Sequence, residues 1–69
     1  MISYNMAKEF IRDLKGTLRV DKTGLPLILP VGYIADRMSL PLDKAKEYCN
    51  AAIKYGLATK TEKMFTLEV

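Results

Sequence analysis

Histidine, tryptophan and glutamine are absent from this chain, and cysteine occurs only at Cys49. A single cysteine excludes an intrachain disulfide, and without histidine the usual zinc ligand sets cannot be assembled. The chain also lacks a glycine-rich phosphate loop, and no serine or cysteine stands beside a general base. We therefore expect no enzymatic activity, no metal and no other cofactor.

Long apolar runs are missing as well. No stretch approaches the roughly 18 apolar residues of a membrane span. The N-terminal stretch MISYNMAKEF has neither the basic region nor the apolar run that is typical of a secretory signal. A lone cysteine suits a reducing compartment. These features predict a cytoplasmic protein that does not contact a membrane.

The residues that are present have the composition of a globular protein, 49% hydrophobic and 28% charged. The 69 residues fit a single domain, residues 1–69, small enough that a homodimer would add useful buried surface. The formal net charge of +3 permits contact with a polyanion. It does not require one, because solvated lysines give the same balance.

The first helix is predicted over residues 4–15. Apolar side chains there recur at intervals of three and four residues, which places them on one face of a helix: Met6, Ala7, Phe10, Ile11 and Leu14. Ser3 or Asn5 can cap its start. Gly16 can adopt the left-handed conformation, so we expect the helix to end there.

Two apolar runs flank a turn signal in residues 17–30. TLRV precedes the turn sequence DKTG, and LPLIL follows it. This pattern predicts either a β-hairpin or one strand with a looped return. Pro26 cannot donate to a sheet ladder, so its strand should lie at a sheet edge or end early.

A proline break separates two further helices. Residues 31–38 predict a short helix with Pro30 at or before its first turn, and residues 41–55 predict a longer one. Pro41 suits the start of a helix but would disrupt its middle. The chain should therefore break near Ser39 and Leu40.

The C-terminal segment predicts a hairpin. Gly56 followed by Leu57 is typical of a helix end, with the glycine left-handed and the leucine folded back onto the helix. The β-prone runs LATKT and MFTLEV then flank a polar tip, which predicts two paired strands.

Small and apolar residues are spaced regularly on both sides of the proline break. They are Ile34, Ala35, Met38, Leu40, Ala45 and Tyr48, with Ser39 at the turn. A bulky side chain at position 35 or 45 would push the two crossing helices apart. Together with YGLATK and the following hairpin, this pattern resembles the winged helix-turn-helix superfamily. Ser39 stands where that superfamily commonly has glycine, and Pro30 where it commonly has a serine or threonine cap.

The resemblance implies an α+β fold: a three-helix core with a C-terminal β-hairpin wing, and a small strand or hairpin between the first two helices. The same spacings also occur in other compact three-helix domains. By resemblance, the helix after Pro41 would enter the major groove of double-stranded DNA and the wing would contact phosphates. The implied function is a small transcriptional regulator acting as a homodimer.

The DNA-binding positions implied by the resemblance lie on the exposed side of that helix and on the wing. They are Leu42, Asp43, Lys44, Lys46, Glu47, Asn50, Lys54, Thr59, Lys60 and Lys63. Asparagine can pair with adenine, glutamate can accept from cytosine, and lysine can approach guanine or phosphate. The same polar residues would also suit an ordinary solvated helix and hairpin.

Asp43 and Glu47 oppose the attraction to phosphates. The alternative function is therefore a winged-helix module that binds a partner protein through this helix or the apolar LPLIL segment. For a homodimer, we expect the seam at Ile2, Tyr4 or LPLIL. Cys49 falls on the core side of its helix, which indicates a small packing residue rather than a reactive thiol.

Overall fold

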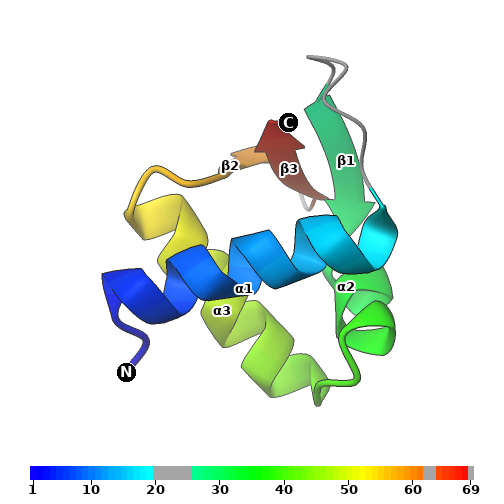
Figure 1. Ribbon diagram of the computed structural model, residues 1–69, viewed down its shortest axis with the longest axis horizontal. Helices are drawn as coiled ribbons and strands as arrows, with labels where there is room; N and C mark the ends of the chain where they lie inside the picture. Colours follow the sequence, from blue (N-terminus) through cyan, green and yellow to red (C-terminus); the bar gives the residue numbers. More distant parts are fainter. Residues whose placement is uncertain (20–25, 62–63, 69) are drawn as a thin grey trace.

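The computed structural model describes residues 1–19, 26–61 and 64–68. In chain order these residues form α1 (Tyr4–Leu18), β1 (Pro26–Pro30), α2 (Val31–Arg37), α3 (Leu42–Lys54), β2 (Thr59–Thr61) and β3 (Met64–Glu68) (Figure 1). The strands form one antiparallel sheet in the order β1-β3-β2. The described part of the chain is thus an α+β fold with three helices and a small three-stranded sheet.

Helix α1 begins as the sequence predicts. The Met6 backbone N–H donates to Ser3 Oγ over 3.2 Å, so Ser3 is the cap. The predicted end at Gly16 is wrong, because the helix continues to Leu18 and Arg19 takes the left-handed conformation at φ 52°. Leu18 lies one turn beyond Leu14 and packs against the core, so its burial favours continuing the helix through the glycine.

Only one strand forms in the described residues between α1 and α2. Thr17 and Leu18 are helical, so a hairpin that pairs TLRV with LPLIL is wrong, whereas the single strand β1 is confirmed. Strand β1 instead pairs with β3, with Leu29 opposite Phe65. Pro26 lies on an edge strand, as predicted. The expected DKTG turn falls outside the described residues.

The break between α2 and α3 lies where the sequence predicts it. Pro30 and Pro41 occupy the positions just before the two helices. At the end of α2, Ser39 is left-handed (φ 55°), and the Leu40 N–H donates to the Ala35 carbonyl over 2.9 Å. The chain therefore turns sharply before α3 begins.

The end of α3 has the same hydrogen-bond pattern. Gly56 is left-handed (φ 75°), and the Leu57 N–H donates to the Ala52 carbonyl over 2.8 Å. Both helices thus end in a Schellman motif, in which a left-handed residue lets the next amide reach back to the last turn. The predicted fold-back of Leu57 is confirmed, and the strand pair β2–β3 follows, as expected.

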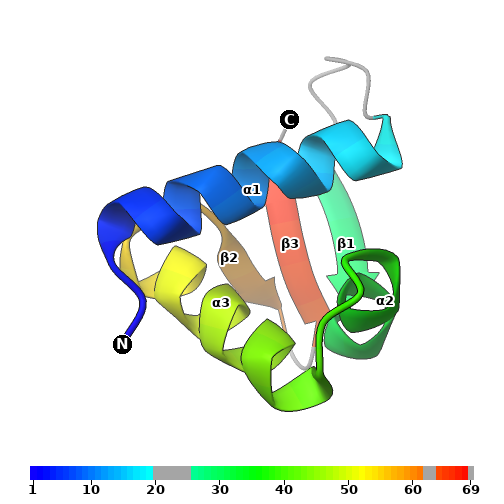
Figure 2. The same ribbon diagram turned by 60° about the horizontal axis from the view of Figure 1, so that its bottom comes forward.

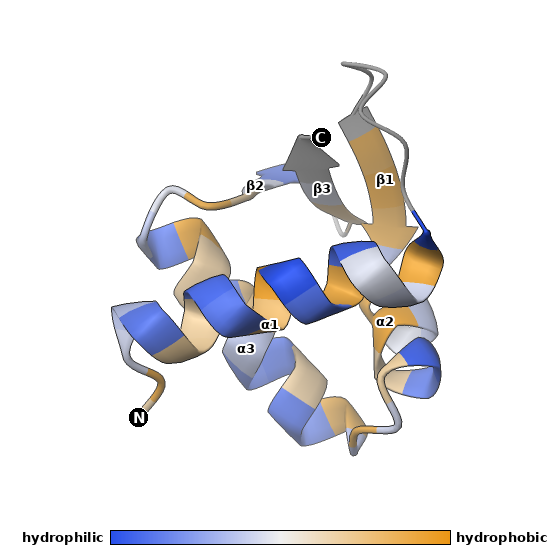
Figure 3. Ribbon diagram, in the orientation of Figure 1, coloured by the Kyte–Doolittle hydropathy of each residue, from blue (hydrophilic) through white to orange (hydrophobic). Residues whose placement is uncertain are grey.

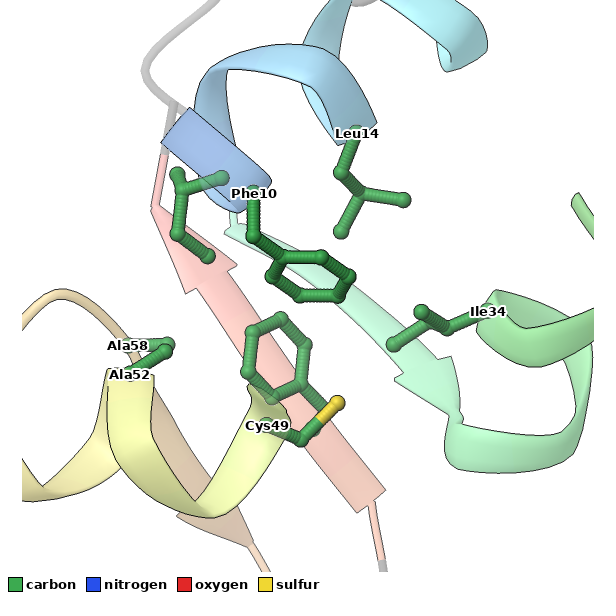
Figure 4. Close-up of a cluster of buried hydrophobic side chains, with 8 residues drawn as sticks. Phe10, Leu14, Ile34, Cys49, Ala52 and Ala58 are labelled. Atoms are coloured by element: carbon green, nitrogen blue, oxygen red, sulfur yellow. The ribbon is translucent and has the colours of Figure 1, made fainter. Parts of the chain in front are cut away.

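The core lies where the helices meet the sheet. In Figure 2, α1 and α3 lie in front of the sheet and α2 lies at the end of β1. Figure 4 shows buried side chains of all three helices converging, among them Phe10, Leu14, Ile34 and Cys49. The Phe10 ring also stacks on Tyr48, with 4.9 Å between centroids. This shared core fixes α3 relative to α1 and α2.

The N-terminal segment packs onto the end of α3. Ile2 is 7% exposed, and its carbonyl accepts a hydrogen bond from the Tyr55 hydroxyl over 3.3 Å. The expectation that Ile2 contributes to a homodimer seam is therefore wrong, because its side chain is already buried within the chain. Tyr4 and Ile28 keep the exposure that such a seam needs.

None of the described helices has the length and apolarity to span a membrane.

Candidate functional site

Helix α3 has a buried side and a polar side. Its buried side consists of small residues, Ala45, Cys49 and Ala52, each at most 2% exposed. The predicted binding residues lie outside this buried side: Leu42, Asp43, Lys44, Lys46, Asn50 and Lys54 are exposed, and Glu47 is half-buried. The helix thus leaves most of these side chains accessible to a partner.

The two wing residues among the described predictions, Thr59 and Lys60, are also exposed. They belong to β2, which is an edge strand of the sheet and pairs with β3. Lys63 lies outside the described residues. On the hairpin, the structure therefore describes the predicted residues of the first strand, Thr59 and Lys60.

A groove of about 300 Å³ brings part of this set together, and we call it the α3–β2 groove. It is lined by Val31, Lys46, Cys49, Asn50, Ile53, Lys60, Met64 and Phe65. Lys46 and Asn50 come from α3, and Lys60 comes from β2. The groove thus combines two cations and one amide with an apolar floor. None of the described residues that line it is acidic.

The carboxylate of Glu47 contacts cations outside this groove. Its Oε2 lies 3.6 Å from Lys44 Nζ, and its Oε1 lies 3.9 Å from the N-terminal amine. The packing of the N-terminal segment against α3 brings that amine near. The negative charge that the sequence places beside the lysines is therefore partly balanced by Lys44 and the chain terminus.

Several predicted residues are not brought into the α3–β2 groove. Lys44 pairs with Glu47, and Lys54 Nζ lies 5.9 Å from the centroid of the Tyr55 ring. Leu42 and Asp43 stand at the start of α3 and do not line the groove. Of the predicted residues that the structure describes, Lys46, Asn50 and Lys60 line the groove.

The floor of the groove was not predicted as part of the site. Ile53 belongs to α3, and Val31, Met64 and Phe65 come from other elements. Phe65 lies opposite Lys60 in the β2–β3 register. Only the folded arrangement shows that these side chains meet, because no local pattern links residues so far apart in sequence.

Cys49 also lines the groove but is a core residue, as predicted. It is 2% exposed, and burial raises the pKa of its thiol to about 11. The thiol therefore stays protonated at neutral pH and is a poor nucleophile. The described residues contain no cluster of side chains suited to holding a metal ion.

A second groove, of about 270 Å³, lies between α1 and the α2–α3 connection, and we call it the acidic groove. It is lined by Met6, Glu9, Phe10, Asp13, Met38, Leu40 and Tyr48. Apolar side chains and two carboxylates therefore lie on the other side of α3 from Lys46 and Asn50. The sequence did not indicate this groove.

Comparison with known proteins gives no match to a family model, to a curated protein or to a solved structure.

Proposed function

We propose that this protein is a double-stranded DNA-binding protein of the winged helix-turn-helix type, a small transcriptional regulator. In this proposal, α3 enters the major groove and the β2–β3 hairpin acts as the wing along the phosphate backbone. The observation that carries the proposal is the α3–β2 groove, where Lys46, Asn50 and Lys60 lie together although they come from a helix and a strand.

The chemistry of these side chains suits a duplex. The Asn50 amide can pair with the N6 and N7 edge of adenine, and Lys46 can approach guanine or a phosphate. Lys60 lies on an edge strand, where an ammonium group can contact the backbone without reading sequence. One surface would thereby provide both base reading and attraction to phosphate.

The pairing of Glu47 supports the same proposal. An unpaired carboxylate beside Lys46 would repel the phosphates, but Glu47 contacts Lys44 and the N-terminal amine. Exposed ion pairs of this kind contribute little to stability. They nevertheless place two positive charges beside the carboxylate, so a nearby phosphate would experience less repulsion.

The experiment is a salt titration of binding to a fluorescent duplex, measured by anisotropy. For the natural protein, the logarithm of the binding constant should fall linearly with the logarithm of salt concentration, because bound phosphates release counterions. The groove variant, Lys46→Gln with Lys60→Gln, should bind every sequence more weakly. Its salt slope should be smaller by roughly 2, since each lost phosphate contact removes about 0.9.

The matched control is Arg37→Gln with Lys54→Gln. Both side chains are exposed and neither lines the groove, so this variant removes the same charge elsewhere. Its slope should stay near that of the natural protein. Equal losses in the two variants would mean that net charge alone sets the affinity, and the assigned site would be wrong.

The acidic groove favours a second candidate function, a module that binds a partner protein. Phe10, Met38 and Tyr48 offer apolar contacts, and Glu9 and Asp13 would attract a basic residue of the partner. An interface dominated by apolar contacts should respond little to salt, in contrast to DNA binding. Absence of duplex binding in dilute salt would remove the DNA proposal and leave this one.

A further inference from the structure

The exposed surface of α1 separates its charges onto two flanks. Successive residues of a helix are about 100° apart, so side chains at intervals of three and four residues share a flank. Lys8, Arg12 and Lys15 have this spacing, and we call them the basic flank. Glu9 and Asp13 fall on the other flank and border the acidic groove. Figure 3 shows how hydrophilic the outer side of α1 is.

The basic flank borders a third groove, of about 620 Å³, which Glu9 of the other flank also lines. It is lined by Asn5, Lys8, Glu9, Ile11, Arg12, Lys15 and Leu57. Lys8 and Arg12 are exposed, and Lys15 is partly exposed. Arg12 Nε lies 3.9 Å from Asp13 Oδ1, but both side chains are well exposed, so this weak pair leaves the guanidinium available.

Three grooves therefore follow one another across the helical side of the molecule. The α3–β2 groove is lined by no described residue of α1, the acidic groove lies between α1 and the α2–α3 connection, and the third is lined by α1 and Leu57. Figure 2 shows α1 and α3 side by side. The two basic surfaces share no lining residue and draw on different helices, α3 for the first and α1 for the second.

We propose that the basic flank of α1 binds the phosphate backbone of a second DNA duplex, so that one domain holds two duplexes together. This inference rests on the proposed function, which assigns the first duplex to the α3–β2 groove. Lys8 and Lys15 are seven residues apart, about 10 Å along the helix. That length matches about three phosphates at roughly 3.4 Å per strand along the duplex axis.

A phosphate backbone fits this surface better than a lipid bilayer does. Binding in a membrane interface requires apolar side chains that can insert beside the cations. Ile11 is 7% exposed and Leu57 is half-buried, so neither offers a freely exposed apolar side chain for insertion.

The test is capture of a fluorescent duplex by protein bound to a second, immobilised duplex. The flank variant, Lys8→Gln with Arg12→Gln and Lys15→Gln, should still bind the immobilised duplex as the natural protein does. It should capture little of the fluorescent duplex. The salt slope of capture should be smaller by roughly 3, because three phosphate contacts are lost. Melting curves of each variant verify that it is folded.

The control Arg37→Gln with Lys54→Gln removes two cations that line neither basic groove and should retain capture, whereas the two-charge flank variant Lys8→Gln with Arg12→Gln should lose most of it. Equal loss of capture in control and flank variant would overturn the inference, because net charge would then explain the effect. Undiminished capture by the flank variant would overturn it too, since a homodimer could hold both duplexes through α3.

The remaining outcomes separate the two proposals. If the natural protein binds one duplex and captures no second one, the inference fails and the proposed function stands. If it binds no duplex at all, both fail. The third arm uses vesicles that contain phosphatidylserine. Vesicle binding that depends on the basic flank, without any effect of the flank on duplex capture, would identify a lipid surface and overturn the inference.

Discussion

The two sides of α3 differ in the size and polarity of their residues. The buried side has Ala45, Cys49 and Ala52, which are small enough for α1 and α2 to pack closely. The other side has Lys46 and Asn50, whose polar side chains remain in solvent. The small residues let α3 pack closely into the core, and the polar side stays exposed, where the proposed function places the DNA. Substitutions on one side should therefore change stability, and those on the other should change binding.

The largest change in stability is expected from Ala45→Leu. Ala45 is fully buried, so the added atoms must displace neighbouring side chains or the adjoining helix. Overpacking of this kind costs about 1–3 kcal/mol of unfolding free energy. Urea denaturation followed by circular dichroism measures the loss.

The matched control is Ala51→Leu, the same substitution on the same helix. Ala51 is only half-buried, so the larger side chain can extend toward solvent. Its effect should stay within about 0.5 kcal/mol, as for other surface changes. Equal destabilisation by the two substitutions would contradict the division of α3 into a packing side and a binding side.

Asn50→Ala tests the polar side of the same helix. The variant should retain the stability of the natural protein but lose discrimination between its preferred duplex and a mismatched one by about 1–3 kcal/mol. Selection from a random duplex pool provides the preferred sequence, and competition gel shifts measure the ratio. Lys60→Gln is the control, since loss of a phosphate contact should weaken all sequences alike. A uniform loss with Asn50→Ala would remove its base-reading role.

The residues that end α2 and α3 allow a smaller change in stability to be tested. Ser39 and Gly56 are both left-handed, but only glycine adopts this conformation without steric cost. Ser39→Gly should therefore stabilise the fold by about 0.5–1 kcal/mol. Gly56→Ala should destabilise it by about 1–2 kcal/mol. Thermal melting measures both, and opposite signs are the expected result. Destabilisation by Ser39→Gly would show that the serine makes a contact worth more than the relief of strain.

The last expected effect appears only at alkaline pH and concerns the thiol of Cys49. Burial raises its pKa in the folded protein from the ordinary value of 9.0 to about 11. Between these values the unfolded chain loses the thiol proton while the folded chain keeps it. Stability must therefore fall as the pH rises from 9 toward 11, and below 9 the thiol contributes no pH dependence. In Cys49→Ala this part of the loss should be absent. Identical pH profiles in urea denaturation would contradict a buried, protonated thiol.

Local signals in the sequence predicted much of the fold. Ser3 as a cap, the prolines at 30 and 41, and Gly56 with Leu57 each act within a few residues, so the helices could be located. The prediction that the first helix ends at Gly16 was wrong. The packing of Leu18, one turn after Leu14, outweighs the conformational freedom of the glycine. The partner of β1 could not be predicted, since β3 lies far along the chain and nothing local specifies that pairing.

The candidate site was predictable as a set of residues but not as an arrangement. Helical periodicity correctly indicated that Lys46 and Asn50 are exposed. It could not indicate that Lys60 lies in the same groove, because that depends on how the hairpin returns beside α3. The pairing of Glu47 with the N-terminal amine could not be predicted from the sequence either, because it depends on the burial of Ile2 against α3.

The most direct test of the central claim is to map backbone amide shifts by NMR while a DNA duplex is added to the labelled protein. If the duplex binds in the α3–β2 groove, the largest changes at limiting duplex fall at Lys46, Asn50 and Lys60. Changes confined to Phe10, Met38 and Tyr48 of the acidic groove, or no changes at all, would contradict the central claim.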